Sequence, residues 1–294
     1  MFSFTVVCSD PSYADECLQK AVAEVQRIET LLTTFNDNSQ TNRINAAAGI
    51  APVQVDEEVF NLVERSIRIS NITDGAFDIS YGSIDKSLWN FDRSMTALPA
   101  IEKARSMVRL INYRNILLNK KEHSVFLKEP GMRIGFGGIG KGYAADRAAA
   151  LLQQAGIASG LVNASGDIKA WGRQADGGEW KVGISHPDDP SGAFSYLSLN
   201  NNAIATSGNY EKFVLINGRK YSHTINPKTG MPVTGIKSVT IIAPGAELAD
   251  AMATPVTIMG VQAGIALVEQ LPGFACIIID DDNNIYSTKN IRLQ

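Results

Sequence analysis

The sequence predicts an α+β protein in which mixed or antiparallel sheets pack against helices. Short strand-like runs outnumber the helical segments, and the dipeptide Asn217-Gly218, a strong hairpin signal, separates two of them. The strict alternation of strand and helix that a doubly wound parallel sheet requires is missing. With 294 residues, 45% of them hydrophobic, the chain is long enough to bury about three-quarters of its unfolded surface. It contains no internal repeat or linker, so we expect a single domain over residues 1–294, built as one body or as two intimate lobes.

Four segments predict helices because apolar residues recur in them at three- and four-residue spacing. The first covers residues 13–34, and the second follows Asp56, a candidate cap with two acidic residues after it. The third covers residues 141–154, and Gly156 just beyond it is the expected C-terminal stop signal. The fourth begins near Glu247. Seven short apolar runs predict strands: 4–8, 124–127, 161–163, 181–184, 212–216, 238–243 and 276–280.

Charge and composition narrow the functional classes. The net charge of −3, the pI of about 5.7 and the lack of a basic block argue against a nucleic-acid partner. The three cysteines are far apart, without metal or disulfide spacing. No apolar run reaches the ~18 residues of a membrane span, and the first residues, MFSFTVVCSD, show no basic leader or cleavage site. A small-molecule site is the default expectation, and a cytoplasmic location stays open beside removal of a leader.

The stretch GFGGIGKG, residues 135–142, matches two phosphate-binding patterns incompletely. The dinucleotide pattern G-x-G-x-x-G should belong to a βαβ unit, which this region does not predict. The Walker A pattern needs Ser or Thr where this chain has Gly142. What remains is a glycine loop that allows close approach of a ligand, a following helix that favours negative charge, and the cation of Lys141. The alternative is that the glycines serve only tight packing.

Three further stretches carry polar groups suited to a site. Asp250 and Thr254 lie one helical turn apart, and hard oxygen ligands of this kind suit magnesium, although such a pair is commonly a solvated helix face. His223 precedes a turn in SHTINPKTGMP, where a neutral imidazole would accept a proton from a hydroxyl, or be structural. In DGAFDIS, Phe77 and Asp78 occupy a turn that leads into a strand. They would contact a ring, or form an ordinary core Phe with a capping Asp.

Together these stretches resemble the ApbE family, the FAD:protein FMN transferases. The resemblance covers nearly the whole chain in collinear order. The matching segments are TTFNDNSQTNRIN (33–45), GAFDIS (75–80), GFGGIGKGYAAD (135–146), VNASGDI (162–168), ATSGNYEKF (205–213), YSHTINPKTGMP (221–232) and ELADAMAT (247–254).

The resemblance implies a magnesium-dependent enzyme that splits FAD and transfers FMN to a Thr or Ser hydroxyl of an acceptor protein, releasing AMP. Typical acceptors are subunits of redox-driven ion pumps and related electron-transfer proteins. Family members usually work outside the cytoplasm, in the periplasm or held at the membrane by a lipid anchor, and this chain shows no lipobox.

The same resemblance assigns residues. Magnesium ligands would be Asp250, Thr254 and the Gly138 carbonyl, and His223 would position or deprotonate the acceptor hydroxyl. The expected flavin or nucleotide contacts are Phe35, Ala76, Phe77, Asp78, Lys141 and Ile225.

Three departures from the family pattern accompany these assignments. Gly135 stands where many members have Asp, Gly140 stands where Ala is usual, and a Met-Gly segment that often precedes the first strand is missing. Two rival functions stay open. One is an FAD hydrolase that gives FMN and AMP, with Asn45 as a candidate control point for water. The other is a flavin-binding protein without turnover.

Overall fold

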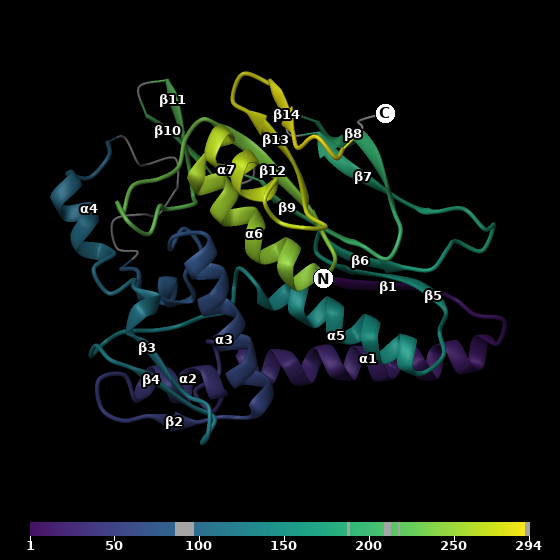
Figure 1. The fold of residues 1–294 in the computed structure, drawn as a ribbon, viewed down its shortest axis with the longest axis horizontal. Helices are drawn as coiled ribbons and strands as arrows, with labels where there is room; N and C mark the ends of the chain where they lie inside the picture. Colours follow the sequence, from purple (N-terminus) through teal and green to yellow (C-terminus); the bar gives the residue numbers. More distant parts are fainter. Residues whose placement is uncertain (86–96, 187–188, 209–212, 217, 292–294) are drawn as a thin grey trace. The chain divides into compact units, whose positions relative to one another are not determined.

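The computed structural model describes residues 1–85, 97–186, 189–208, 213–216 and 218–291 (Figure 1). The chain forms two compact units, each assembled from segments that are distant in the sequence. Unit 1 comprises Met1–Ile28, Ile139–Tyr210 and Ile236–Gln294, and unit 2 comprises Glu29–Gly138 and Glu211–Gly235.

Unit 1 is built around a seven-stranded sheet in which every neighbouring pair is antiparallel. Because the neighbours in this sheet are mostly distant in the sequence, its core depends on long-range pairing. In spatial order the strands are β1 (Phe2–Val7), β5 (Ser159–Ala164), β6 (Asp167–Trp171), β9 (Ala203–Gly208), β12 (Ile236–Ala243), β13 (Ala275–Asp280) and β14 (Ile285–Ser287).

Helices and a hairpin cover this sheet. Helix α5 (Gly140–Gln154) contacts β5 and β6, and α6 (Ala246–Met259) contacts α5, β9 and β12 (Figure 1). Helix α7 (Val261–Val268) follows α6, and α1 (Pro11–Leu32) has its first 18 residues in this unit, where Glu24 accepts a hydrogen bond from Arg147 of α5 at 3.0 Å. The hairpin of β7 (Trp180–His186) and β8 (Asp189–Leu199) packs on the sheet through a buried apolar cluster. Both α5 and α6 therefore pack on the sheet, and the first turns of the two helices lie next to each other.

Unit 2 is smaller and richer in short elements. Its three-stranded sheet has the order β2-β4-β3, and a separate hairpin pairs β10 with β11. The elements are α2 (Gln40–Ala46), β2 (Val53–Gln54), α3 (Glu57–Ile72), α4 (Ile101–Met107), β3 (Ile116–Asn119), β4 (Ser124–Leu127), β10 (Phe213–Ile216), β11 (Arg219–Ser222) and the 3₁₀-helices η1 (Ile79–Ser83) and η3 (Tyr113–Asn115).

The predicted α+β class is confirmed, and among the described strands every pair is antiparallel. The four predicted helices correspond to α1, α3, α5 and α6, and all seven predicted runs fall on strands. The predicted hairpin forms between β10 and β11, with Gly218 in the left-handed region (φ 77°), while Asn217 lies outside the described residues.

Asp56 occupies the N-cap of α3 as predicted, with Glu57 and Glu58 in the first turn, although its side chain makes no capping hydrogen bond. One local prediction was wrong. The passage after Asp78 forms the 3₁₀-helix η1 instead of a strand, because the Asp78 carboxylate accepts the Ser80 N–H at 2.8 Å and so starts a helical turn.

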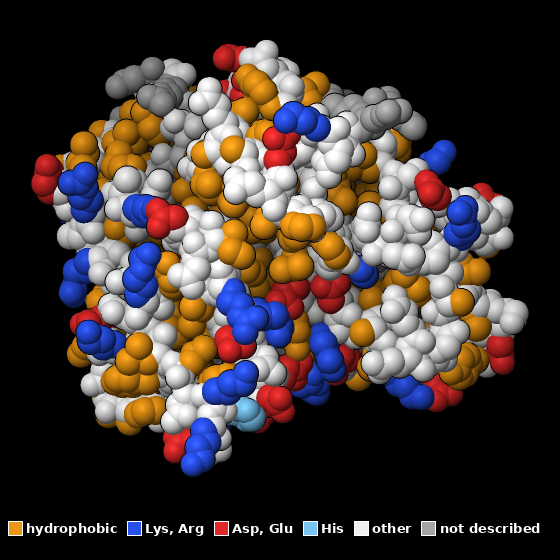
Figure 2. Space-filling view, viewed as in Figure 1, with side chains coloured by type: hydrophobic (Ala, Val, Ile, Leu, Met, Phe, Trp, Pro, Cys, Tyr) orange, Lys and Arg blue, Asp and Glu red, His pale blue; other side chains and the backbone are white. Residues whose placement is uncertain are grey.

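Charged side chains of both signs are interspersed on the face shown in Figure 2, including the area over α1 and α5. This pattern differs from the one-signed area that a nucleic-acid surface displays. Within the described residues, no helix combines the length and the hydropathy needed to cross a membrane.

Candidate functional site

The glycine loop does not owe its composition to unusual backbone angles. None of Gly135, Gly137, Gly138 and Gly142 has a positive φ. A Cβ at Gly137 would meet nothing within 4 Å, and at Gly135 or Gly138 its nearest contact would be an ordinary 3.7 Å. A Cβ at Gly142, however, would lie 2.1 Å from the Ala246 carbonyl oxygen. Glycine is therefore required at position 142 because α5 and α6 pack closely there. The other three glycines leave space beside the backbone.

Two buried carboxylates and one lysine gather in unit 1, at the start of α5. Lys141 Nζ donates a hydrogen bond to Asp167 Oδ2, and Asp250 Oδ2 accepts the Gly142 N–H at 3.1 Å. Asp167 is 3% exposed and Asp250 is 7% exposed. Because buried charges need partners, the lysine and the helix N-terminus are what make this pair of acids tolerable.

The charges at this position shift one another's pKa values. Burial, together with repulsion from the Asp167 charge, raises the pKa of Asp250 to about 7 against the opposing effect of Lys141. Burial also raises the pKa of Asp167, although Lys141 opposes the shift. Desolvation lowers the pKa of Lys141, but attraction to Asp250 and Asp167 outweighs it, so the net shift is upward. The cluster is thus acid-rich, and an added cation would relieve the repulsion between the two carboxylates.

Asp250 and Thr254 lie one turn apart on α6, as predicted. Thr254 is half-buried, and no described residue hydrogen-bonds its hydroxyl. By contrast, Thr257 Oγ1 donates to the Ala253 carbonyl at 2.9 Å. No group of three or more His, Cys, Asp or Glu residues gathers in the described parts of the chain. A metal bound here would therefore combine a carboxylate with hydroxyl, carbonyl or ligand oxygens, a donor set that fits magnesium.

Asp146 fixes the helix that carries these two residues. Its carboxylate accepts the N–H groups of Ala246 and Glu247, both at 2.9 Å, and so caps the N-terminus of α6 from α5. Gly245, the N-cap residue, has no side chain to do so, and a Cβ there would lie 2.7 Å from Asp146 Oδ2. Asp146 therefore sets the position of the helix that presents Asp250.

In unit 2, the predicted flavin turn is packed into the protein. Ala76, Phe77 and Asp78 are all buried, and a Cβ at Gly138 would lie 3.7 Å from the Phe77 ring. The Asp78 carboxylate accepts the Ser80 hydroxyl at 2.6 Å and the Tyr113 N–H at 2.8 Å, and burial raises its pKa. This geometry is that of a core Phe with a capping Asp, the second of the two interpretations of these residues.

The loop between α1 and α2 presents an aromatic side chain to solvent. Phe35 is 99% exposed, yet its backbone is held in place: its N–H donates to Thr33 Oγ1 at 3.1 Å. Asn42 Nδ2 donates to the flanking Thr34 and Asn36 carbonyls at 3.0 and 2.9 Å. A fully exposed ring on a fixed loop is suited to stacking on a planar ligand.

Asn45 braces the backbone that precedes the glycine loop. Its Nδ2 donates to the Ile134 carbonyl at 3.0 Å, and its Oδ1 accepts the Ile134 N–H at 2.7 Å. Asn45 is 7% exposed, so its amide is used inside the protein. The contacts describe a residue that positions residues 134 and 135.

His223 follows β11 directly, as predicted, and its side chain is exposed. The turn behind it is fixed: Gly230 N–H donates to the Asn226 carbonyl at 2.9 Å, and a Cβ at Gly230 would lie 2.1 Å from the Ala104 carbonyl oxygen. The Ile225 side chain is buried against α4, so only its backbone is available to a ligand.

The structure therefore places the predicted residues in two groups. Lys141, Asp250 and Thr254 belong to unit 1. The predicted residues of unit 2 are Phe35, Asn45, Ala76, Phe77, Asp78, Gly138, His223 and Ile225.

Sequence reasoning missed Asp167 and Asp146. Asp167 lies in the tight turn of ASGD, where an acid is expected for turn formation alone, and its partner Lys141 is 26 residues away. The one available signal was that VNASGDI and GFGGIGKGYAAD, which contain these two residues, are among the matching segments.

The antiparallel α+β fold and the acid-rich cluster beside a glycine loop define a protein with a charged, phosphate-compatible site. Comparison with known proteins identifies the family: the model of the ApbE family matches residues 1–278, so the chain belongs to the ApbE family.

Named relatives and solved structures agree with this assignment. The FAD:protein FMN transferase of Escherichia coli K12 is 30% identical over 285 residues, covering 95% of this chain and 81% of the relative. The FAD:protein FMN transferase of Treponema pallidum is 32% identical over 292 residues, covering 93% and 80%. The crystal structure of the ApbE protein of Thermotoga maritima matches with a TM-score of 0.84 and 29% identity, covering 97% of this chain and 93% of the other. The apo flavinyl transferase ApbE of Pseudomonas stutzeri matches with a TM-score of 0.84 and 26% identity, covering 98% and 91%.

Proposed function

We propose that this protein is a magnesium-dependent FAD:protein FMN transferase. The relatives that match along almost the whole chain carry this activity in their names. The observation of the structure that carries the proposal is the cluster of Lys141, Asp167 and Asp250, since a diphosphate and its metal need both a cation and buried carboxylate oxygens.

The residues of unit 1 fit a magnesium ion. Asp250 supplies a buried carboxylate, and Thr254 supplies a hydroxyl that no described residue hydrogen-bonds. The family resemblance implies the Gly138 carbonyl of unit 2 as a third ligand. Magnesium would supply charge stabilisation of the diphosphate in the transition state. Lys141 is placed to neutralise phosphate oxygens as a point charge.

In unit 2, Phe35 would stack on the flavin ring, and the Ile225 backbone would be a further contact. The buried Phe77 would support the turn beside Gly138. Ala76 lines the same turn, and Asp78 acts through the turn that it caps. Asn45 would fix the backbone position of Ile134, which directly precedes the glycine loop.

In the transfer step, the acceptor Thr or Ser oxygen forms a bond to the FMN phosphorus. The bond from that phosphorus to the bridging oxygen breaks, and AMP leaves with the bridging oxygen. The hydroxyl proton goes to His223, whose exposed position at the end of β11 suits contact with a protein substrate. The acceptor would be a subunit of a redox pump or an electron-transfer protein, and the enzyme would act in the periplasm or at the membrane.

The assay that tests this proposal follows both products of FAD cleavage. With FAD, magnesium and an acceptor peptide that carries one Thr, we expect AMP release to equal the amount of FMN attached to the peptide. Free FMN in an amount equal to AMP, with no labelled peptide, would instead identify a hydrolase. FAD that stays intact would identify a binding protein.

A further inference from the structure

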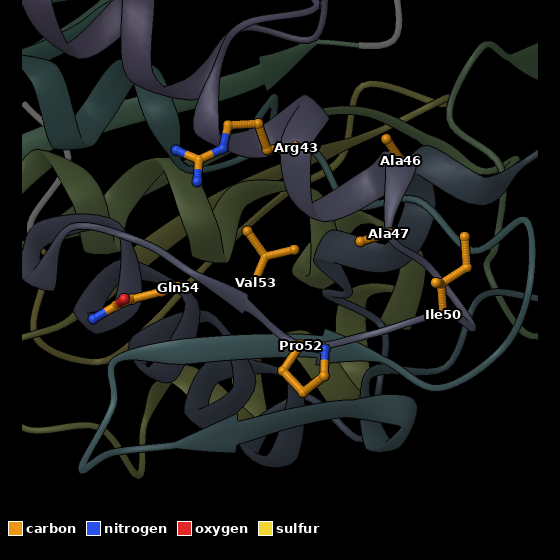
Figure 3. A pocket seen from close by; sticks show the side chains of 7 residues that line it. All are labelled: Arg43, Ala46, Ala47, Ile50, Pro52, Val53 and Gln54. Atoms are coloured by element: carbon orange, nitrogen blue, oxygen red, sulfur yellow. The ribbon is translucent and has the colours of Figure 1, made fainter.

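A groove in unit 2 lies between α2 and the edge strand β2, and its volume is about 600 Å³ (Figure 3). Five of its seven lining residues are apolar, and one of them, Ile50, is 78% exposed. The lining residues are Arg43, Ala46, Ala47, Ile50, Pro52, Val53 and Gln54.

The β2 edge of this groove carries backbone groups available for pairing. Because the Val55 N–H donates to the His123 carbonyl at 3.0 Å, the alternation of an antiparallel ladder directs the N–H and C=O of Gln54 away from β4. The next outward N–H, that of Asp56, is already capped by Gln40 Oε1 at 2.8 Å. No described residue bonds the Gln54 N–H. The edge therefore offers the N–H and C=O of Gln54, one residue at which an added strand would pair.

The groove also carries a cation. Arg43 is exposed on the groove side of α2, and no hydrogen bond or ion pair of its guanidinium is found within the described residues. The exposed face of an extended segment that carried an Asp or Glu would complement this charge, while its apolar side chains would contact Ile50 and Val53.

We infer that this groove docks an extended segment of the acceptor protein, with alternating apolar and acidic side chains, as a strand added to β2. The inference rests on the proposed function, which requires a protein substrate. A second copy of the chain fits less well, because β2 has two residues and the seven-residue groove is small beside the ~800 Å² per partner of a stable interface.

The position of α2 connects the groove to the start of the glycine loop. One face of α2 lines the groove, and its buried residue Asn45 holds Ile134 at the start of the glycine loop. A helix is about 10 Å across, and three or four extended residues span that distance. A Thr or Ser a few residues beyond the docked segment would therefore reach the glycine loop.

The test measures binding of two fluorescein-labelled peptides by anisotropy. Each peptide alternates Val with a charged residue before a single Thr, and the charged residue is Asp in one and Lys in the other. We expect the wild-type protein to bind the Asp peptide. Arg43→Glu should weaken that binding about tenfold and strengthen binding of the Lys peptide. Gln54→Pro should weaken binding of both, because it removes the outward N–H at an edge position that tolerates proline.

Lys120→Glu is the matched control, since Lys120 is an exposed cation of the same unit in the turn between β3 and β4, and it should bind as wild type does. Neither groove variant should change cleavage of FAD in the absence of acceptor. Equal binding of the Asp peptide by wild type and Arg43→Glu, or no binding by wild type, overturns the docking proposal. A dimer that both groove variants dissociate would also overturn it. Peptide binding without any FMN transfer would leave docking intact and refute the transferase.

Discussion

Replacing Gly142 with Ala sets two physical effects against each other. In a helix interior the change gains about 1 kcal/mol of stability from helix propensity. At this position, however, the added Cβ would lie 2.1 Å from the Ala246 carbonyl oxygen and 2.8 Å from the Glu247 nitrogen, where ordinary contacts begin at 3.4 Å. Both neighbours are backbone atoms, so α5 and α6 must separate by about 1 Å. We expect this separation to cost about 3 kcal/mol, the upper end of the range for overpacked cores.

The net loss of unfolding free energy is then about 2 kcal/mol, which corresponds to a fall in Tm of about 3 °C for a chain of 294 residues. Thermal denaturation followed by circular dichroism measures it. The matched control is Gly137→Ala, where a Cβ meets nothing within 4 Å, and its stability should change by less than about 0.5 kcal/mol. An unchanged or higher Tm for Gly142→Ala would refute the explanation of this glycine by helix packing.

Three further predictions concern the charged residues of α5 and α6. Asp146→Ala removes the cap of α6 and should lower the urea midpoint by an amount equivalent to about 1–2 kcal/mol; an unchanged midpoint would show that the cap contributes nothing. Burial raises the pKa of Asp250 from 3.8 to about 7, so in the metal-free protein this carboxyl's contribution to stability is fully present below pH 3.8 and is lost as the pH rises to 7. Magnesium must displace that proton, so calorimetry in buffers of different ionisation enthalpy should detect proton release at pH 6 and none at pH 8; equal release at both would contradict the shift. Lys141→Met removes the cation that lowers the pKa of Asp250. The pH above which magnesium binding no longer releases a proton should therefore rise.

Periodic segments and turn chemistry could be predicted from the sequence because their causes are local. The apolar spacing of residues 13–34 and the Asn217-Gly218 turn specify α1 and the β10–β11 hairpin without knowledge of their neighbours. Helix α2 escaped prediction since its seven residues, QTNRINA, lack an apolar period. The Ser39 cap and the contacts of Asn45 with Ile134 hold it instead.

The site itself depended on long-range contacts that no local pattern contains. Asp250 and Thr254 were predicted as a pair because one helical turn separates them. The role of Asp167 comes from Lys141, and the constraint on Gly142 comes from Ala246, 104 residues further along the chain. For Asp78 the residue type suggested both a ligand contact and a cap. Its contacts with Ser80 and Tyr113 show the cap, and the ligand contact stays a prediction.

Intact-mass spectrometry of an acceptor peptide carrying one Thr, incubated with FAD, magnesium and this protein, tests the central claim most directly. We predict a mass gain equal to attached FMN that disappears with EDTA and with Asp250→Ala. The gain should persist with Asp176→Ala, which removes an exposed turn carboxylate of the same unit. Labelling that survives both EDTA and Asp250→Ala would contradict the claim that the carboxylate cluster at the start of α5 carries a metal-dependent transfer.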